Sequence, residues 1–406
     1  MASATRLLWQ DSVLIQRNSV SGFQSDAGAD VGFEVFVQGY SSSCGPINNL
    51  IFSSNVFGDA SNPGAVDQNG IGIIGCGFAG QAVTNTDARG NIYQNIGGKA
   101  GIGGGNAGSG FVPNSIQLVT SQFELFHDIG ARENTCGAGL GAFSYLTDQW
   151  LVQFSEASNI QVIPQYPPPS SLCDVSGFGF DRGNTNSTAQ YLYAHNNTGS
   201  GFYTLPNGST ANVTGNSWGP NTVRYSIFEN NVTGGNGFCC GQLALGIESA
   251  ASPGTLYAYN LTMFTNVTFS ANGAASICIQ TGAGGNWGAG SVLANNICEV
   301  AGTNQFGAWF YGDPSGGPFG CAHGLTIINN GWYNSSGQNP IWSCYNINYN
   351  TLAAWAANSG GLIKITNDLT SNPGLTSVGA GGNCMASTPG SITGPQPCPS
   401  AYKLSS

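Results

Sequence analysis

The stretches Gly177-Phe-Gly-Phe-Asp181 and Ala189-Gln-Tyr-Leu-Tyr-Ala-His-Asn196 carry the two patterns that decide the fold. The first is a short apolar run preceded by glycine or another small residue, and it recurs as Ala244-Leu-Gly-Ile-Glu248 and Ser276-Ile-Cys-Ile-Gln280. The second is a strand-like run that ends in asparagine, and it recurs as Val223-Arg-Tyr-Ser-Ile-Phe-Glu-Asn230. Repeats spaced by roughly 20 to 40 residues are typical of a solenoid whose coils carry insertions at their corners.

These repeats predict an all-β fold, a right-handed parallel β-helix of about ten coils in which corner asparagines bond the backbone of the next coil. We expect one domain over residues 1–406, with residues 367–406 as a C-terminal closing segment. A β-sandwich is the competing architecture. It would need polar/apolar hairpins with tight two-residue turns and would not produce a recurring column of asparagines.

The composition excludes several partners. With nine Lys and Arg residues and a net charge of −10, the chain is not expected to bind nucleic acid or an anionic membrane. Twelve cysteines without a paired Cys-x-x-Cys spacing, and only three histidines, predict disulfides of a secreted protein and no metal site. No run of 18 apolar residues occurs, so the sequence predicts no membrane-spanning helix. We expect a monomer without a cofactor, and a structural calcium ion is left open.

Residues 174–202 resemble the core of secreted right-handed parallel β-helix proteins of the pectate-lyase-like superfamily. Relatives read Asp-Gly-Asp-Gly-Phe-Asp-Phe-Asp and then have a Tyr-rich strand. Residues 368–375 resemble the segment that closes such helices. The resemblance implies the fold and a secreted carbohydrate-active protein. Where the family pattern has further acids, this chain has Ser176 and Gly179.

Side-chain alternation sets the expected register of the glycine-led strands. If Phe178 and Phe180 fill the core, then Gly177 and its alternating neighbours face outward. The same reasoning predicts one interior file made of Phe180, Ile247 and Ile279.

That register predicts an outward column made of Asp181, Leu205, Glu248 and Gln280. Coils stack about 4.8 Å apart, which places Asp181 and Glu248, two coils apart, roughly 9 to 10 Å from each other. This separation lies near the upper end of the range of about 6.5–9.5 Å used by inverting glycosidases. The competing interpretation is a pair of solvated surface carboxylates.

A second column comes from the asparagine-terminated strands, whose alignment brings together Ser158, His195 and Glu229. Glu156 aligns instead with Tyr193 and Ile227, and His127 lies one coil earlier. Imidazole near carboxylate is an arrangement suited to general acid/base chemistry. A structural histidine bonded to a corner backbone is the other interpretation.

The remaining candidates concern substrate binding and disulfides. We expect substrate contacts from Asp174, Arg182, Trp218 and Trp287, because aromatic rings stack on sugars and the tryptophans sit in Gly/Asn-rich insertions. Arg182 follows Asp181 directly and is also positioned to pair with it. The cysteine spacing suggests the pairs Cys321–Cys344 and Cys384–Cys398.

The leading hypothesis is therefore a secreted enzyme that hydrolyses glycosidic bonds of a polysaccharide. Its carboxylate pair is Asp181 with Glu248, Glu156 or Glu229. The first alternative is a non-catalytic glycan-binding or surface β-helix. The second is a polysaccharide lyase, for which the scarce candidate bases are Arg182, Arg224 and Lys99.

Overall fold

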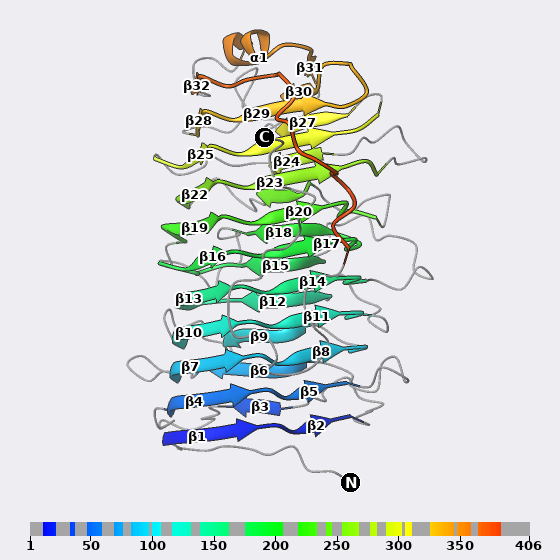
Figure 1. Cartoon of the computed structure of the whole chain (residues 1–406). Helices are drawn as coiled ribbons and strands as arrows, with labels where there is room; N and C mark the ends of the chain where they lie inside the picture. Colours follow the sequence, from blue (N-terminus) through cyan, green and yellow to red (C-terminus); the bar gives the residue numbers. More distant parts are fainter. Residues whose placement is uncertain are drawn as a thin grey trace.

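The computed structural model shows a long stack of short strands (Figure 1). Its described residues are 11–21, 33–36, 47–58, 69–75, 83–96, 100–106, 116–130, 139–161, 175–205, 218–233, 241–245, 254–267, 277–281, 290–302, 305–310, 325–344, 347–358 and 364–382. Within these ranges the chain forms 32 strands and one short helix. Successive coils rise along one axis from the N-terminal strands to the helix at the opposite end.

The described strands form three sheets that run the length of the molecule. Sheet A consists of β1 (Asp11–Gln16), β4 (Ile47–Ser53), β7 (Val83–Arg89), β10 (Ile116–Gln122), β13 (Thr147–Gln153), β16 (Thr188–Gln190), β19 (Asn221–Arg224), β22 (Leu256–Tyr259), β25 (Val292–Ala294), β28 (Thr326–Ile328) and β32 (Lys364–Thr366). Sheet B consists of β2 (Ser19–Val20), β5 (Val56–Phe57), β8 (Ile92–Gln94), β11 (Leu125–His127), β14 (Glu156–Ser158), β17 (Tyr193–His195), β20 (Ile227–Glu229), β23 (Thr262–Thr265), β26 (Ile297–Val300) and β29 (Gly331–Asn334).

Sheet C consists of β3 (Phe33–Phe36), β6 (Asn69–Gly75), β9 (Ala100–Asn106), β12 (Leu140–Ser144), β15 (Ser176–Phe180), β18 (Ser200–Thr204), β21 (Leu243–Leu245), β24 (Ile277–Thr281), β27 (Phe306–Phe310), β30 (Ile341–Cys344) and β31 (Ile347–Tyr349). Strands that are neighbours in a sheet belong to successive coils and run parallel, as in the pairing of β14 with β17. The pair β30–β31 at the C-terminal end is antiparallel. The parallel β-helix predicted from the repeats is confirmed.

A row of glycines at the start of sheet C explains why the apolar runs are preceded by glycine. A Cβ atom added to Gly177 would lie 2.9 Å from the Cβ of Ala194, and one added to Gly101 would lie 2.3 Å from the ring of Phe126. The glycines therefore face the interior, where sheet B packs directly on their backbone. The expectation that Gly177 faces outward is wrong, because two consecutive positions of this strand contact the core.

The register of sheet C differs from the expected one by two residues. Ile279 pairs with Leu243, and the file continues through Phe202 to Phe178. Phe180 instead shares its file with Thr204, Leu245 and Thr281. The prediction that Phe180 and Ile279 share a file is therefore wrong, and Ile247 lies outside the described residues. The slip arose because Leu243, Leu245 and Ile247 are equally apolar and two residues apart.

Asparagine ladders stabilise the corners, as the sequence predicts. Asn197 donates its amide to the carbonyl of Ala157 on the preceding coil at 3.2 Å, and Asn231 donates to the carbonyl of Ala194 at 2.9 Å. The residues before these two, Asn196 and Asn230, adopt left-handed backbone conformations with φ of 54° and 47°. The asparagine that ends each run thus makes the turn, and the next residue forms the ladder.

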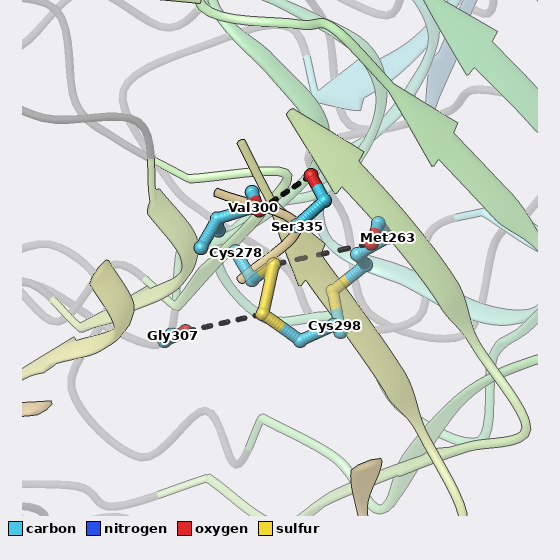
Figure 2. The surroundings of a disulfide bond; sticks show 6 residues. All are labelled: Met263, Cys278, Cys298, Val300, Gly307 and Ser335. Atoms are coloured by element: carbon cyan, nitrogen blue, oxygen red, sulfur yellow. Dashed lines mark hydrogen bonds between the residues drawn. A yellow bond between two sulfur atoms is a disulfide. The ribbon is translucent and has the colours of Figure 1, made fainter. Parts of the chain in front are cut away.

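A disulfide joins two sheets across the interior (Figure 2). Cys278 of β24 is bonded to Cys298 of β26, and both side chains are buried. Cys278 takes the place that glycine occupies on other coils, beside Gly307 on the next coil. Cys344 is also disulfide-bonded, with a partner outside the described residues. Cys321, Cys384 and Cys398, which complete the two expected pairs, likewise lie outside that part of the chain.

The helix α1 (Leu352–Asn358) covers the C-terminal end of the core. Its Trp355 is fully buried, and its ring centroid lies 5.1 Å from that of Phe310 on β27. No helix formed by the described residues has the length and apolarity needed to cross a membrane.

Candidate functional site

The outer face of sheet B gathers the ionisable side chains of the second predicted column. The middle residues of β14, β17 and β20 are Ala157, Ala194 and Phe228, and all three are fully buried in the core. Because side chains alternate along a strand, the residues on either side of each point to the outer face. This face therefore carries Glu156, Ser158, Tyr193, His195, Ile227 and Glu229.

The register of sheet B agrees with the sequence prediction. Ser158 pairs with His195, and His195 pairs with Glu229. Glu156 pairs with Tyr193, which pairs with Ile227. His127 pairs with Ser158, and its Nδ1 atom lies 2.8 Å from Oδ2 of Asp128.

Glu156 and His195 form a buried pair on adjacent coils. Oε1 of Glu156 lies 2.9 Å from Nε2 of His195, and the two side chains are 1% and 3% exposed. On the other side of the ring, the amide nitrogen of Asn196 lies 3.1 Å from Nδ1 of His195. An amide donor at Nδ1 places the imidazole proton on Nε2, where it is donated to the carboxylate.

Tyr193 connects this pair to the second carboxylate. Its hydroxyl donates to Oε2 of Glu229 at 2.6 Å, and its ring stacks on His195 with centroids 4.3 Å apart. Tyr193 and Glu229 are both buried. The stacked rings therefore lie between two carboxylates: Glu156 is hydrogen-bonded to His195, and Glu229 is hydrogen-bonded to Tyr193.

The spacing of the coils bounds the separation of the two carboxylates. Glu156 and Glu229 belong to β14 and β20, with β17 between them. Two strand spacings amount to about 10 Å along the axis. The side chains lean toward each other, since both reach the rings of the intervening strand.

A third carboxylate lies further along the same row. Glu229 pairs with Phe264, and Phe264 pairs with Glu299 of β26. Burial raises the pKa of Glu299, and a hydrogen bond from Ser335 offsets part of that rise. The sequence reasoning missed Glu299, although the register that aligned His195 with Glu229 reaches it two coils later.

Residues 368–382, here called the strap, descend over this face from the C-terminal end (Figure 1). Near the start of the strap, the backbone carbonyl of Leu369 accepts a hydrogen bond from the backbone N–H of Trp332 at 2.8 Å. Leu375 and Val378 then pack against Phe264. Finally the backbone N–H of Gly381 donates to Oε1 of Glu229 at 3.4 Å.

The first predicted column is placed elsewhere, at the corner between sheets C and A. The carboxylate of Asp181 accepts the backbone N–H of Arg182 at 2.7 Å, and the Arg182 guanidinium lies 4.0 Å away. Leu205 follows Thr204 as Asp181 follows Phe180, so this pair shares a column as expected. Gln280 does not belong to it, because Gln280 pairs with Ala244. Glu248, the proposed partner, lies outside the described residues.

The expected substrate contact by Trp218 is not supported by its position. Its side chain is 3% exposed, and Nε1 donates to the backbone carbonyl of Asp181 at 3.0 Å. The indole thus stabilises the corner between sheets C and A from the inside. Asp174 and Trp287 lie outside the described residues. Within the described ranges, no three His, Cys, Asp or Glu side chains are grouped to hold a metal ion.

Comparison with known proteins gives a likeness of fold alone. No protein-family model and no curated protein sequence matches the chain. Among solved structures, a catalytic domain of GH87 alpha-1,3-glucanase in complex with nigerose is 11% identical, with a TM-score of 0.34 over 88% of this chain. A variant of that domain in complex with tetrasaccharides is 12% identical, with a TM-score of 0.32 over 88% of this chain. The chain spans 64% of the length of each.

Proposed function

We propose that this protein is a carbohydrate-active enzyme that hydrolyses glycosidic bonds of a polysaccharide with Glu156 and Glu229. One observation carries the proposal: two buried carboxylates are held on either side of the stacked rings of Tyr193 and His195. The chain has only 19 acids and three histidines in 406 residues, and two of the acids and one histidine lie together on three successive strands of one sheet. This pair replaces Asp181 and Glu248 as the leading candidates for the catalytic carboxylates.

The two carboxylates have different surroundings, which suit different roles. Both oxygens of Glu229 accept hydrogen bonds, from the hydroxyl of Tyr193 and the N–H of Gly381, and these contacts hold the carboxylate in place for the role of a base that activates water. Glu156 is positioned by its hydrogen bond with His195, and in its protonated form its carboxyl group would deliver a proton to a leaving group. A substrate hydroxyl or water would take the place of the Gly381 N–H at Glu229.

The separation of the two coils favours inversion of the anomeric centre. Retaining glycosidases need carboxyl groups about 5 Å apart, whereas inverting enzymes leave room for water with a separation of roughly 6.5–9.5 Å. Glu156 and Glu229 are separated by an intervening strand. We therefore propose an inverting reaction.

The wider setting belongs to the same proposal. We place the protein with the secreted β-helices of the pectate-lyase-like superfamily, on the resemblance of residues 174–202 and 368–375. The Cys278–Cys298 disulfide supports function in an oxidising compartment outside the cell. We propose that it acts as a monomer on a polysaccharide.

One observation favours a second function, a non-catalytic glycan-binding β-helix. Glu156 and His195 are almost completely buried, which is also the property of a structural pair. A lyase has less support, because the guanidinium of Arg224 bonds Gln190 and Tyr259, and that of Arg182 lies beside Asp181. The third candidate base, Lys99, lies outside the described residues.

A panel of polysaccharides separates these functions. Release of reducing ends is measured with neutral glucans, including alpha-1,3-glucan, with xylan and galactomannan, and with polygalacturonate. Hydrolysis yields new reducing ends without unsaturated products, and NMR during the first turnovers should show the inverted anomer. Binding without any release would support the second function, and absorbance from unsaturated products would identify a lyase.

A further inference from the structure

An exposed aromatic ladder runs along the corner between sheets A and B. The rings stack with centroids 5.2 Å apart between Phe123 and Phe154, 4.9 Å between Phe154 and Tyr191, and 5.3 Å between Tyr191 and Tyr225. Tyr259 closes the ladder edge-on at 5.9 Å. Tyr191 and Tyr225 are 45% and 42% exposed.

The backbone at these positions is unusual for aromatic residues. Phe123, Phe154, Tyr191 and Tyr225 have φ between 51° and 57°, the left-handed region that bulky side chains rarely adopt. On later coils the turn before sheet B is made by asparagines, such as Asn260, which suits this conformation better. Aromatic residues on four successive coils therefore persist against a local backbone cost, and a repeated cost of this kind points to a use.

A second ladder of polar side chains lies next to the rings. Gln153 donates to Gln122 at 3.1 Å, and Gln190 donates to Gln153 at 2.8 Å. The guanidinium of Arg224 then donates to Gln190 at 2.8 Å and lies 5.5 Å from the ring centre of Tyr225. Each amide keeps a further donor or acceptor for solvent or a ligand.

The two ladders border the carboxylate cluster. Phe154 is two residues before Glu156, and Tyr191 is two residues before Tyr193. The intervening Ser155 and Leu192 are buried in the core, so the aromatic residues and the cluster residues point to the same side of the coil, with the cluster residues buried there. A chain lying on the rings would therefore run alongside the strands β14 and β17, which carry Glu156 and His195.

We propose that this aromatic stripe, made of Phe154, Tyr191, Tyr225, Gln153 and Gln190, binds a linear, uncharged glycan along the axis of the helix. The five side chains of the stripe are uncharged, Arg224 is the single cation beside them among the described residues, and the chain carries a net charge of −10, so the stripe suits a neutral polymer better than a polyuronate. The inference rests on the proposed function and names the class of its substrate.

The contacts expected follow from the geometry of the stack. Neighbouring rings cover each other's faces, so sugar rings meet ring edges, phenol hydroxyls and glutamine amides. Binding should therefore depend on hydrogen bonds from the hydroxyls of Tyr191 and Tyr225. Aromatic edges add apolar contact to the sugar C–H groups.

Affinity electrophoresis in gels that contain galactomannan, xylan, mixed-linkage glucan or polygalacturonate tests the proposal. The full chain should be retarded by at least one neutral polymer and less by polygalacturonate. The double variant Tyr191→Ala/Tyr225→Ala should raise the Kd about tenfold, and Tyr191→Phe/Tyr225→Phe should raise it about threefold. The matched control is Ile347→Ala, whose side chain is 53% exposed on β31 and which should bind as the parent does.

The outcomes separate this proposal from the proposed function. Binding that depends on Tyr191 and Tyr225 in a protein without hydrolytic activity would refute the enzyme and keep the glycan site. Equal binding by the parent and both tyrosine variants, stronger binding to polygalacturonate, or no binding to any neutral polymer would overturn the glycan site. Thermal unfolding of each variant checks that the fold is kept, and the Phe variants retain the ring stack if the Ala variants unfold.

Discussion

The Nε2 atom of His195 lies 2.9 Å from Oε1 of Glu156, although the two residues are 39 positions apart in the chain. The contact exists because each coil of the β-helix returns the chain to the same face, so that β17 lies beside β14. The solenoid thus converts a repeat in sequence into a row of side chains in space. The same row continues to Glu229 and Glu299.

Tyr193→Phe should destabilise the protein. The substitution removes the hydroxyl that donates to the buried Glu229 and leaves a carboxylate oxygen without that partner. A buried acceptor that loses its donor costs about 1–3 kcal/mol in the free energy of unfolding. Urea unfolding measures the loss, and Tyr257→Phe, whose side chain is 37% exposed, is the control that should change little. Equal stability of the two variants would show that the Tyr193 hydroxyl contributes nothing.

Glu124→Gln should weaken the pH dependence of stability. Glu124 is fully buried, and burial raises its pKa well above the usual value, with smaller opposing contributions from Asn91 and Tyr93. A raised pKa in the folded state means that the neutral form is favoured by folding. Its contribution is complete below the unfolded pKa of about 4.3 and is lost as the pH rises through the folded pKa.

The measurement compares the two proteins between pH 4 and pH 8. The free energy of unfolding of the parent should fall with rising pH relative to that of Glu124→Gln, because the amide stays neutral. Asp148→Asn on sheet A serves as the control. Parallel curves for the parent and Glu124→Gln would contradict the assignment.

Gly141→Ala should disrupt the packing of sheet C. An added Cβ would lie 2.3 Å from the carbonyl oxygen of Gly177, and backbone cannot move aside as a flexible side chain can. We expect a loss of at least about 1–3 kcal/mol, the cost of overpacking. Gly331→Ala is the matched control, because nothing lies within 4 Å of its added Cβ. Thermal unfolding that is the same for both variants would argue against an inward glycine row.

Val378→Asp should loosen the strap. Val378 and Leu375 pack against Phe264, and a carboxylate in that apolar contact would lose its hydration. Hydrogen exchange at Gly381 should accelerate, and His195 should react faster with an imidazole-modifying reagent. Leu369→Asp, at a position 62% exposed, is the control for added charge. Unchanged rates in Val378→Asp would show that the strap does not cover the cluster.

The sequence predicted sheet B better than sheet C, for a physical reason. The runs ending at Asn159, Asn196 and Asn230 each have a fixed number of residues before a left-handed turn, so their register has a single solution. In sheet C the apolar residues recur every second position, and a slip by two residues keeps the same alternation. Leu243 and Leu245 were therefore interchangeable by pattern.

The contacts of the strap could not be predicted from local patterns. Gly381 and Glu229 are 152 residues apart, and their hydrogen bond uses a backbone N–H that any residue except proline supplies. The hydrogen bond between Tyr193 and Glu229 could have been predicted, because the alignment of the repeats placed the two residues on adjacent coils. Trp218 was misjudged because its Gly/Asn-rich context suggested exposure, whereas its indole bonds the Asp181 carbonyl inside the corner.

The central claim is that Glu156 and Glu229 hydrolyse a glycan, and the rate of reducing-end release by single amide variants tests it most directly. On a polysaccharide that the parent cleaves, Glu156→Gln and Glu229→Gln should each lower kcat by roughly 10²–10⁴-fold, because an amide can neither take nor give the proton. Asp148→Asn should keep the parental rate. Parental turnover in both glutamine variants, with the fold intact, would contradict the account.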